Sequence, residues 1–274
     1  MNAAQWARAA GLGVCVAALL VASGALATTA AAPANTTVKA ATAKTTAKPA
    51  ARKGVVEPGS VQALHAMSAY LRAIPTFSVK MDTERDEVDD YGQLLTFTGG
   101  TTYRVKSPDG FNMEFAEGDK VRSYIYDGKS VTMLDPATGY YTVFKAPGTI
   151  RQTLDLAAEK YGLTVPLDDL FHWDQGEDPA KALISGHYVG PARVNGQDAE
   201  HYAFRQKSVD WQIWIAKGDK PLPLRVVIVG ATDPARPQFE ANLVWDTAPQ
   251  FTAETFVFTP PANAKMIPIR SEGQ

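Results

Sequence analysis

Apolar and polar residues alternate along most of the chain after residue 76. The alternation is clearest where Val209, Trp211 and Ile213 are separated by Asp210 and Gln212. A period of two places successive side chains on opposite faces of a sheet and is typical of β-strands. Short runs of this kind, separated by glycine and proline turns, predict an antiparallel meander of about eleven strands.

The predicted strands fall into two groups on either side of a helical segment. The first group comprises 77–88, 93–99, 101–108, 111–118, 120–128, 129–136 and 139–147. The second group comprises 185–206, 209–217, 223–231, 238–247 and 255–261, with a tight hairpin turn at Asn195-Gly196. This order excludes a doubly wound α/β fold, in which strands and helices alternate.

Two regions have helical spacing instead. Ahead of the first strand, apolar residues recur at helical intervals from Val61 to Leu71, with Ser60 available as the N-cap and Pro75 as the end. Between the two groups, 149–162 predicts a helix and 165–173 a second short helix. We expect these helices to lie against the concave side of a strongly curved sheet.

The hairpin around Asp127-Gly128 shows why one side of the sheet needs a cover. One face of this ribbon carries Tyr124, Tyr126, Val131 and Met133, and the other carries Val121, Ile125 and Leu134. Neither face is suited to water. We therefore expect one face to meet the helices, and the other to contact neighbouring residues or partly face solvent.

The N-terminus has the pattern of a secretory signal peptide. Arg8 precedes an apolar run from Gly11 to Ala27, which ends in small residues. The run is shorter than the ~20 strongly apolar residues of a spanning helix, so we assign residues 1–27 to a cleaved signal peptide; the alternative is membrane tethering by an uncleaved segment. Cys15 follows Val14 inside the run and does not match a lipoprotein cysteine. Cleavage would remove this single cysteine, and with it any disulfide, thiol nucleophile or cysteine metal site.

Residues 28–58 differ in composition from the rest of the chain. Alanine, threonine, lysine and proline dominate, which predicts a disordered tether ahead of a folded domain at 59–270. Six of the 27 basic residues precede residue 54, whereas all 29 acidic residues follow it, so the remaining chain carries a formal charge of −8. An acidic domain argues against nucleic acid as the main partner, and the basic tail indicates at most peripheral membrane contact.

The residues that carry chemistry are scattered. The four histidines, His65, His172, His187 and His201, show no paired metal-binding spacing. The acidic run 82–90 lacks the pattern of a calcium loop, and alternation favours a solvated, aggregation-resistant hairpin there. No Gly-x-Ser-x-Gly motif seats a serine nucleophile. The sequence thus predicts no catalytic residue, no metal site and no cofactor, and we interpret the protein as a non-enzyme; an enzyme whose site assembles from residues distant in sequence remains an alternative.

Three segments carry a family resemblance: "YRVKSPDGFNMEF", "YIYDGKSVTMLDPATGYY" and "TFVFTPPANAKMI". The chain resembles the superfamily of the periplasmic lipoprotein carrier LolA and its relative LolB, over about residues 60–270, and is most similar to an uncharacterised branch of predicted periplasmic proteins. The matching positions are Pro108, Phe111, Asn112, Asp127, Gly128, Lys129, Asp135, Pro136, Phe256, Phe258, Thr259, Pro260 and Pro261.

The resemblance implies an unclosed, strongly curved antiparallel β-barrel, with an N-terminal helix and an inserted helix pair as a lid. It also implies that the concave face receives acyl chains. One position departs from the carrier, because Ser107 stands before Pro108 where the carrier has the arginine that latches its lid. Arg104 lies three residues earlier and has the opposite strand parity. From the resemblance we therefore expect the cavity in this chain, but not the carrier's gated cycle of loading and release.

The combined expectation is a non-enzymatic periplasmic protein that binds lipid, lipoprotein acyl chains or another hydrophobic ligand in a concave cavity. The candidate lining residues are Leu95, Phe97, Tyr124, Tyr126, Met133, Trp211, Trp214, Val227 and Trp245, and the candidate lid residues are Leu154, Leu170 and Phe171. For each of them, ordinary core packing is the competing interpretation. The alternative function is a periplasmic sensor or adaptor that binds an envelope protein through the curved sheet.

Overall fold

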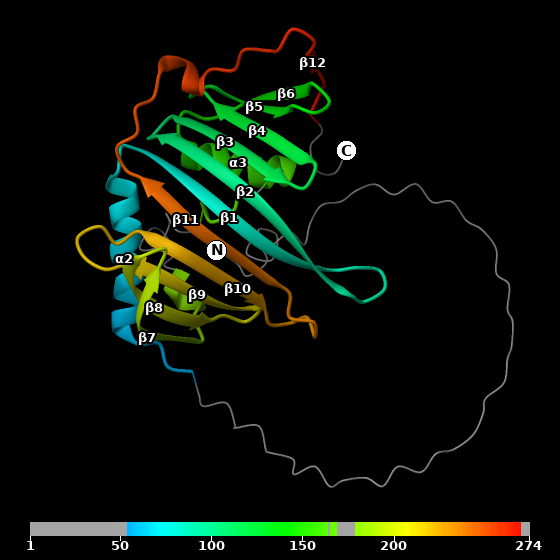
Figure 1. The fold of residues 1–274 in the computed structure, drawn as a ribbon. Helices are drawn as coiled ribbons and strands as arrows, with labels where there is room; N and C mark the ends of the chain where they lie inside the picture. The colour runs from blue at the N-terminus through cyan, green and yellow to red at the C-terminus, as the bar shows by residue number, and fades with distance from the viewer. Residues whose placement is uncertain (1–53, 164, 169–178, 270–274) are drawn as a thin grey trace, which may run out of the picture. The chain divides into compact units, whose positions relative to one another are not determined.

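The computed structural model describes residues 54–163, 165–168 and 179–269. Within them, twelve strands form a sheet in the order β12-β6-β5-β4-β3-β2-β1-β11-β10-β9-β8-β7 (Figure 1). Neighbouring strands are antiparallel throughout, except that β12 runs parallel to β6. The two end strands, β12 and β7, do not pair with each other, so the sheet is not closed into a barrel. The predicted class, a mostly β and unclosed curved sheet with helices, is confirmed.

The strands follow the predicted alternation closely. Their bounds are β1 (Thr76–Val88), β2 (Leu94–Lys106), β3 (Gly110–Glu117), β4 (Lys120–Tyr126), β5 (Ser130–Asp135), β6 (Tyr140–Lys145), β7 (Ser185–Val194), β8 (Gln197–Arg205), β9 (Val209–Ala216), β10 (Pro223–Gly230), β11 (Gln238–Asp246) and β12 (Lys265–Met266). Short 3-10 helices occur at η2 (Pro179–Ala182) and η3 (Ala253–Phe256).

Helix α2 (Pro58–Ala73) begins with proline in its first turn and has Glu57 at the N-cap. The predicted N-cap, Ser60, lies instead inside the first turn, where its Oγ donates to the Glu57 carbonyl oxygen at 2.8 Å. Ile74 is extended, as expected for a residue before proline, and it ends the helix. The buried face of α2, which includes Leu64, Met67 and Leu71, packs in one cluster with β1 and β8–β11.

Helix α3 (Ile150–Tyr161) lies in the predicted insertion between the two strand groups. Thr149 is its N-cap and accepts from the backbone N–H of Gln152, while Gly162 ends it in the left-handed region at φ 65°. Of the described residues 165–168, only Asp168 has helical backbone, of the 3-10 type. The second predicted helix, with Leu170 and Phe171, otherwise lies outside the described residues.

The β4–β5 hairpin has both of its apolar faces covered, at least in part. On the inner face Tyr126 pairs with Val131, and both are buried in the cluster that includes α3. On the outer face Leu134 pairs with Tyr141, whose ring contacts Phe258 with centroids 5.0 Å apart. The C-terminal segment therefore shields part of the face that helices do not reach.

Two predicted strand boundaries differ from the structure. Residues 93–99 and 101–108 were expected as separate strands, but β2 runs through Gly99 and Gly100 without a turn. A side chain at Gly99 would lie 2.8 Å from the Ala116 carbonyl oxygen, so glycine there permits close approach of β3. The expected strand at 255–261 is replaced by η3 and an extended segment, because two consecutive prolines lack the N–H groups a strand needs.

Within the described residues, no helix is both long enough and apolar enough to span a membrane.

Candidate functional site

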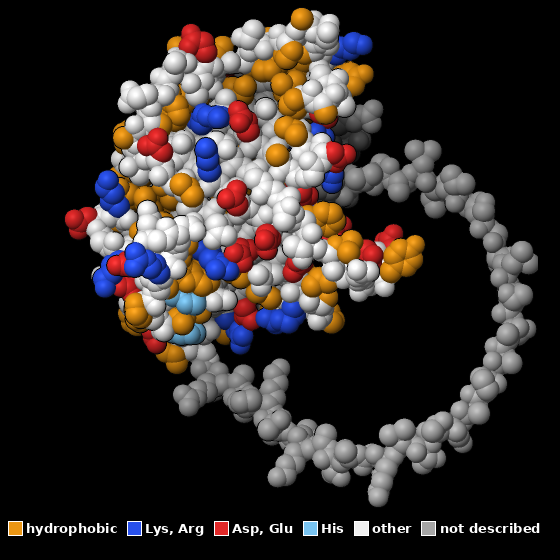
Figure 2. Space-filling view, in the orientation of Figure 1, with side chains coloured by type: hydrophobic (Ala, Val, Ile, Leu, Met, Phe, Trp, Pro, Cys, Tyr) orange, Lys and Arg blue, Asp and Glu red, His pale blue; other side chains and the backbone are white. Residues whose placement is uncertain are grey.

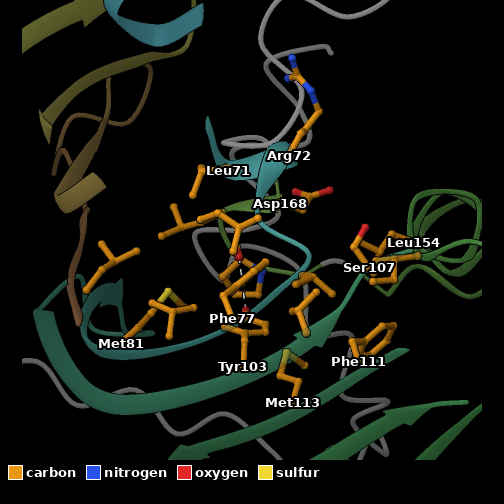
Figure 3. Close-up of a pocket in the computed structure, with 18 of the residues that line it drawn as sticks. Leu71, Arg72, Phe77, Met81, Tyr103, Ser107, Phe111, Met113, Leu154 and Asp168 are labelled. Atoms are coloured by element: carbon orange, nitrogen blue, oxygen red, sulfur yellow. Dashed lines mark hydrogen bonds between the residues drawn. The ribbon is translucent and has the colours of Figure 1, made fainter. Parts of the chain in front are cut away.

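A cavity of about 330 Å³ lies between the inner face of the sheet, the end of α2, the start of α3 and segment 165–168 (Figure 3). Its apolar lining comprises Leu71, Ile74, Phe77, Val79, Met81, Tyr103, Val105, Phe111, Met113, Ile150, Leu154, Val165, Pro166, Leu167, Leu243 and Trp245. Its polar lining comprises Arg72, Ser107, Arg151 and Asp168. The volume is at the lower end of the range for small-molecule sites.

Strand pairing arranges the cavity floor in continuous apolar rows. In the first row, Val105 on β2 lies between Phe77 on β1 and Phe111 on β3. In the second row, Tyr103 lies between Val79 and Met113, and Trp245 of β11 extends the row beyond Val79. A third pair, Met81 and Leu243, adds to the floor. Since inward side chains recur at every second position, the three strands β1–β3 present an almost uninterrupted apolar surface.

The walls of the cavity come from the two helices and the segment after α3. Leu71 and Ile74 mark the end of α2, where the chain turns into β1. Ile150 and Leu154 lie one helical turn apart on the first half of α3, so they face the cavity together. The buried Thr153 hydroxyl donates to the Pro147 carbonyl oxygen at 3.1 Å and holds the start of α3 in place.

The polar atoms of the floor are already paired. The Tyr103 hydroxyl donates to the Pro166 carbonyl oxygen at 3.3 Å, and burial raises the pKa of this phenol well above its usual value, so it stays neutral. The Trp245 indole Nε1 donates to the Pro223 carbonyl oxygen at 2.7 Å. The floor therefore offers a hydrocarbon-like surface with no ionised group.

The charged side chains of the lining come from the two helices and from segment 165–168, and Asp168 lies close enough to Tyr103 to raise the pKa of its phenol further. Arg72 donates to the Ser68 hydroxyl at 2.6 Å, and Arg151 lies 3.7 Å from the Asp155 carboxylate. Figure 3 shows Arg72 pointing away from the floor, with Asp168 nearby, while Ser107 lies beside Leu154. Ser107 is thus part of the cavity lining.

Two of the predicted lining and lid residues, Leu154 and Trp245, line this cavity. Tyr124, Tyr126 and Met133 share its face of the sheet, but they pack farther along, in the cluster that includes α3. Trp211 also shares the face, where it is fully buried and stacks on Phe204 with centroids 4.2 Å apart. Their assignment to a ligand site stays a prediction.

Other predicted lining residues lie elsewhere. Trp214 and Val227 have the opposite parity to the buried Ile213 and Val226, so they lie on the other face of the sheet. Leu95 and Phe97 belong to the β1–β2 hairpin, beyond the cavity. Leu170 and Phe171 are outside the described residues.

Sequence reasoning missed most of the floor. The overlooked residues are Phe77, Val79, Met81, Tyr103, Val105, Phe111 and Met113. The sequence alternates in all three strands, but the acidic second half of β1 favours a solvated hairpin. Phe77 is the first large apolar residue after Pro75, which ends the helix. Its position indicates that the odd-numbered residues at the start of β1 face α2 and the cavity.

Among the described residues, no histidine lines the cavity. His201 lies on the far face, where it stacks on Trp214 with ring centroids 4.1 Å apart and contacts the Gln212 amide oxygen at 3.0 Å. Burial lowers the pKa of this imidazole. Among the described residues, no group of three or more histidine, cysteine, aspartate or glutamate side chains is placed to hold a metal ion.

Comparisons with known proteins give a family and a set of distant structures. The family described as "Predicted periplasmic protein (DUF2092)" matches residues 60–270, which confirms the predicted branch and the periplasmic location. No curated protein sequence matches the chain.

Three of the similar solved structures are as follows. An uncharacterized conserved protein from Thermus thermophilus is 12% identical, with a TM-score of 0.45, covering 77% of this chain and 99% of that one. LprF from Mycobacterium bovis is 12% identical, with a TM-score of 0.43 and coverages of 77% and 100%. A chain of the Pseudomonas aeruginosa MucA/MucB complex is 16% identical, with a TM-score of 0.40. The match covers 73% of this chain and 61% of that one.

Proposed function

The chain belongs to this family of predicted periplasmic proteins, and we propose that it binds the hydrocarbon part of a lipid, or of a lipoprotein's acyl chains, in the cavity without converting it chemically. The observation that carries the proposal is the set of apolar rows across β1, β2, β3 and β11. A surface of this kind binds through removal of apolar area from water and needs no titrating group.

The expected gain is large enough for useful affinity. At ~0.8 kcal/mol per buried methylene, about ten methylenes contribute roughly 8 kcal/mol before ordering costs. The neutral, hydrogen-bonded Tyr103 supports this role, because an ionised or unpaired group in the floor would oppose hydrocarbon binding. The polar side chains at the boundary, including Arg72 and Arg151, suit a ligand whose polar end stays near water.

A pair of substitutions on α3 tests the proposal. Leu154→Trp adds an indole to the cavity wall, whereas Glu159→Trp places the same residue on the exposed side of the same helix. Uptake of a fluorescent long-chain fatty acid should weaken about tenfold in Leu154→Trp and stay unchanged in Glu159→Trp. Equal affinities in the two variants, or no uptake by the unmodified protein, would overturn the proposal.

A further inference from the structure

The hairpin between β1 and β2 extends past its neighbouring strands. Pairing of β11 with β1 ends at Arg85, and pairing of β3 with β2 ends at Gly99. Residues 86–98, named here the β1–β2 arm, therefore form strand pairs only with each other within the described chain. Figure 1 shows the arm projecting away from the rest of the sheet. Isolated two-stranded ribbons are marginally stable in water, so this one needs local support.

Polar contacts supply that support at both ends. At the base, Arg85 donates to both carboxylate oxygens of Glu117 on β3, at 2.8 and 3.2 Å, and lies 5.1 Å from the centre of the Phe97 ring. At the tip, the Asp89 carboxylate accepts from the backbone N–H groups of Tyr91 and Gln93 at 2.9 and 2.8 Å. The arm is thus preformed by hydrogen bonds rather than by apolar packing.

The apolar side chains of the tip are left in water. Tyr91 is 95% exposed in the turn, and Val88 and Leu94, which are directly paired across the strands, are also exposed. Figure 2 shows hydrophobic and acidic side chains together at the end of this projection. A solvated hairpin accounts for the acids but leaves a preformed apolar tip unexplained. Exposed apolar groups gathered at one place mark contact sites.

The charge of the arm restricts its partner. The segment 86–98 contains four acids, Asp86, Glu87, Asp89 and Asp90, and no lysine or arginine. An anionic lipid surface would repel it, and so would the arm of a second copy. A basic rim around an apolar groove complements both properties of the tip. We propose that the β1–β2 arm docks into an apolar groove with a basic rim on a partner protein, with Tyr91 as the central contact.

The proposal is separate from the cavity, since no residue of the arm lines it. Tyrosine is enriched among the residues that dominate binding energy, and a preformed loop lowers the ordering cost of association. Asp89 positions Tyr91 by accepting its backbone N–H. The Asp86 carboxylate instead accepts hydrogen bonds from the Thr96 hydroxyl and the Gln238 backbone N–H.

Photo-crosslinking in cells that make the full chain tests the arm. A benzophenone amino acid replaces Tyr91 in one version and Lys220, on the exposed β9–β10 loop, in the matched control. We expect one protein adduct at position 91 and none at position 220. The crosslinked protein is then identified, purified and titrated against the unmodified chain.

In that titration, Tyr91→Ala should weaken binding about tenfold, as should raising NaCl from about 0.05 M to about 0.5 M. Lys220→Ala should change nothing, and Tyr91→Ala should leave fatty-acid uptake unaltered. The proposal is overturned by the absence of a protein adduct at 91, by equal adducts at both positions, or by insensitivity of binding to Tyr91→Ala and salt. Binding of the arm to phosphatidylglycerol vesicles would equally overturn it in favour of a membrane.

Discussion

The hydroxyl of Tyr103 on β2 donates to the carbonyl oxygen of Pro166, 3.3 Å away, and so joins the cavity floor to the segment that borders it (Figure 3). This hydrogen bond is a direct polar link between the sheet and the segment that borders the cavity. The phenol is neutral, because burial raises its pKa. The contact thus joins the floor to the bordering segment through a neutral group.

Tyr103→Phe should lower the free energy of unfolding by about 1 kcal/mol, because it leaves the Pro166 carbonyl oxygen without this donor. Affinity for a fatty acid should change less than about twofold, since the ring is retained. Urea unfolding and fluorescence titration measure the two effects. Tyr91→Phe is the control, because its hydroxyl lies in water. A Tyr103→Phe variant with unchanged stability would contradict the role assigned to this hydrogen bond.

Helix α2 also supports the fold through Leu64, which does not line the cavity. Leu64 is fully buried, and Leu64→Ala should cost about 2–5 kcal/mol of unfolding free energy. Gln62→Ala, on the exposed side of the same helix, should stay within about 0.5 kcal/mol of the unmodified chain. Denaturant midpoints compare the two variants. Similar midpoints would mean that α2 does not pack on the sheet as described.

The C-terminal signature acts as an anchor through Phe256. Its buried ring would lie 3.3 Å from a side-chain carbon added at Gly110, and it also lies near Lys106. Phe256→Ala should lower stability by about 3–5 kcal/mol, as for other buried phenylalanines. Val257→Ala, at an exposed neighbouring position, should have little effect. Thermal unfolding of the two variants distinguishes an anchored segment from a loosely attached one.

Alternation and turn residues predicted nearly all of the strands, because each strand has one face against a core. They did not identify that face. Trp211 and Trp214 occur in the same alternating run, yet the first is core and the second lies across the sheet beside His201. They are three positions apart, with two residues between them, so strand parity assigns them to opposite faces. Only the packing of α2, a contact between distant segments, decides which parity is inward.

Contacts between distant segments also explain why the C-terminal strand and the extent of the β1–β2 hairpin were not predicted. Phe256 and Phe258 alternate as in a strand, but Pro260 and Pro261 prevent ladder hydrogen bonds, and the segment forms η3 instead. The prediction that Asp82, Glu84 and Asp86 share an outward face agrees with the exposure of Asp82 and Glu84, while Asp86 is partly buried. The projection of the arm was invisible in the sequence, because it depends on where β3 and β11 stop.

The Asp210 carboxylate accepts from Arg205 at 2.6 Å and from Arg236 at 3.0 Å. The hydrogen bond from Arg205, and then that from Arg236, lower the pKa of Asp210. The stabilising contribution is therefore complete above the unfolded value of about 3.9 and is lost as the pH falls below it toward the lowered folded value.

Asp210→Asn should accordingly reduce stability at neutral pH and flatten the loss of stability in acid. Urea midpoints between about pH 2 and pH 7 measure this. Asp219→Asn, on the exposed β9–β10 loop, is the control. Parallel pH profiles for Asp210→Asn and the unmodified chain would refute the assigned ion pairs.

Native mass spectrometry of the mature protein, purified from its own periplasm without detergent and followed by lipid extraction, tests the central claim most directly. The account predicts a reproducible one-to-one adduct whose mass matches an extracted lipid or acylated molecule, and predicts that Leu154→Trp depletes it while Glu159→Trp retains it. A protein that is free of such an adduct, and that also fails to take up a fluorescent fatty acid, would contradict the assignment of the cavity as a hydrocarbon-binding site.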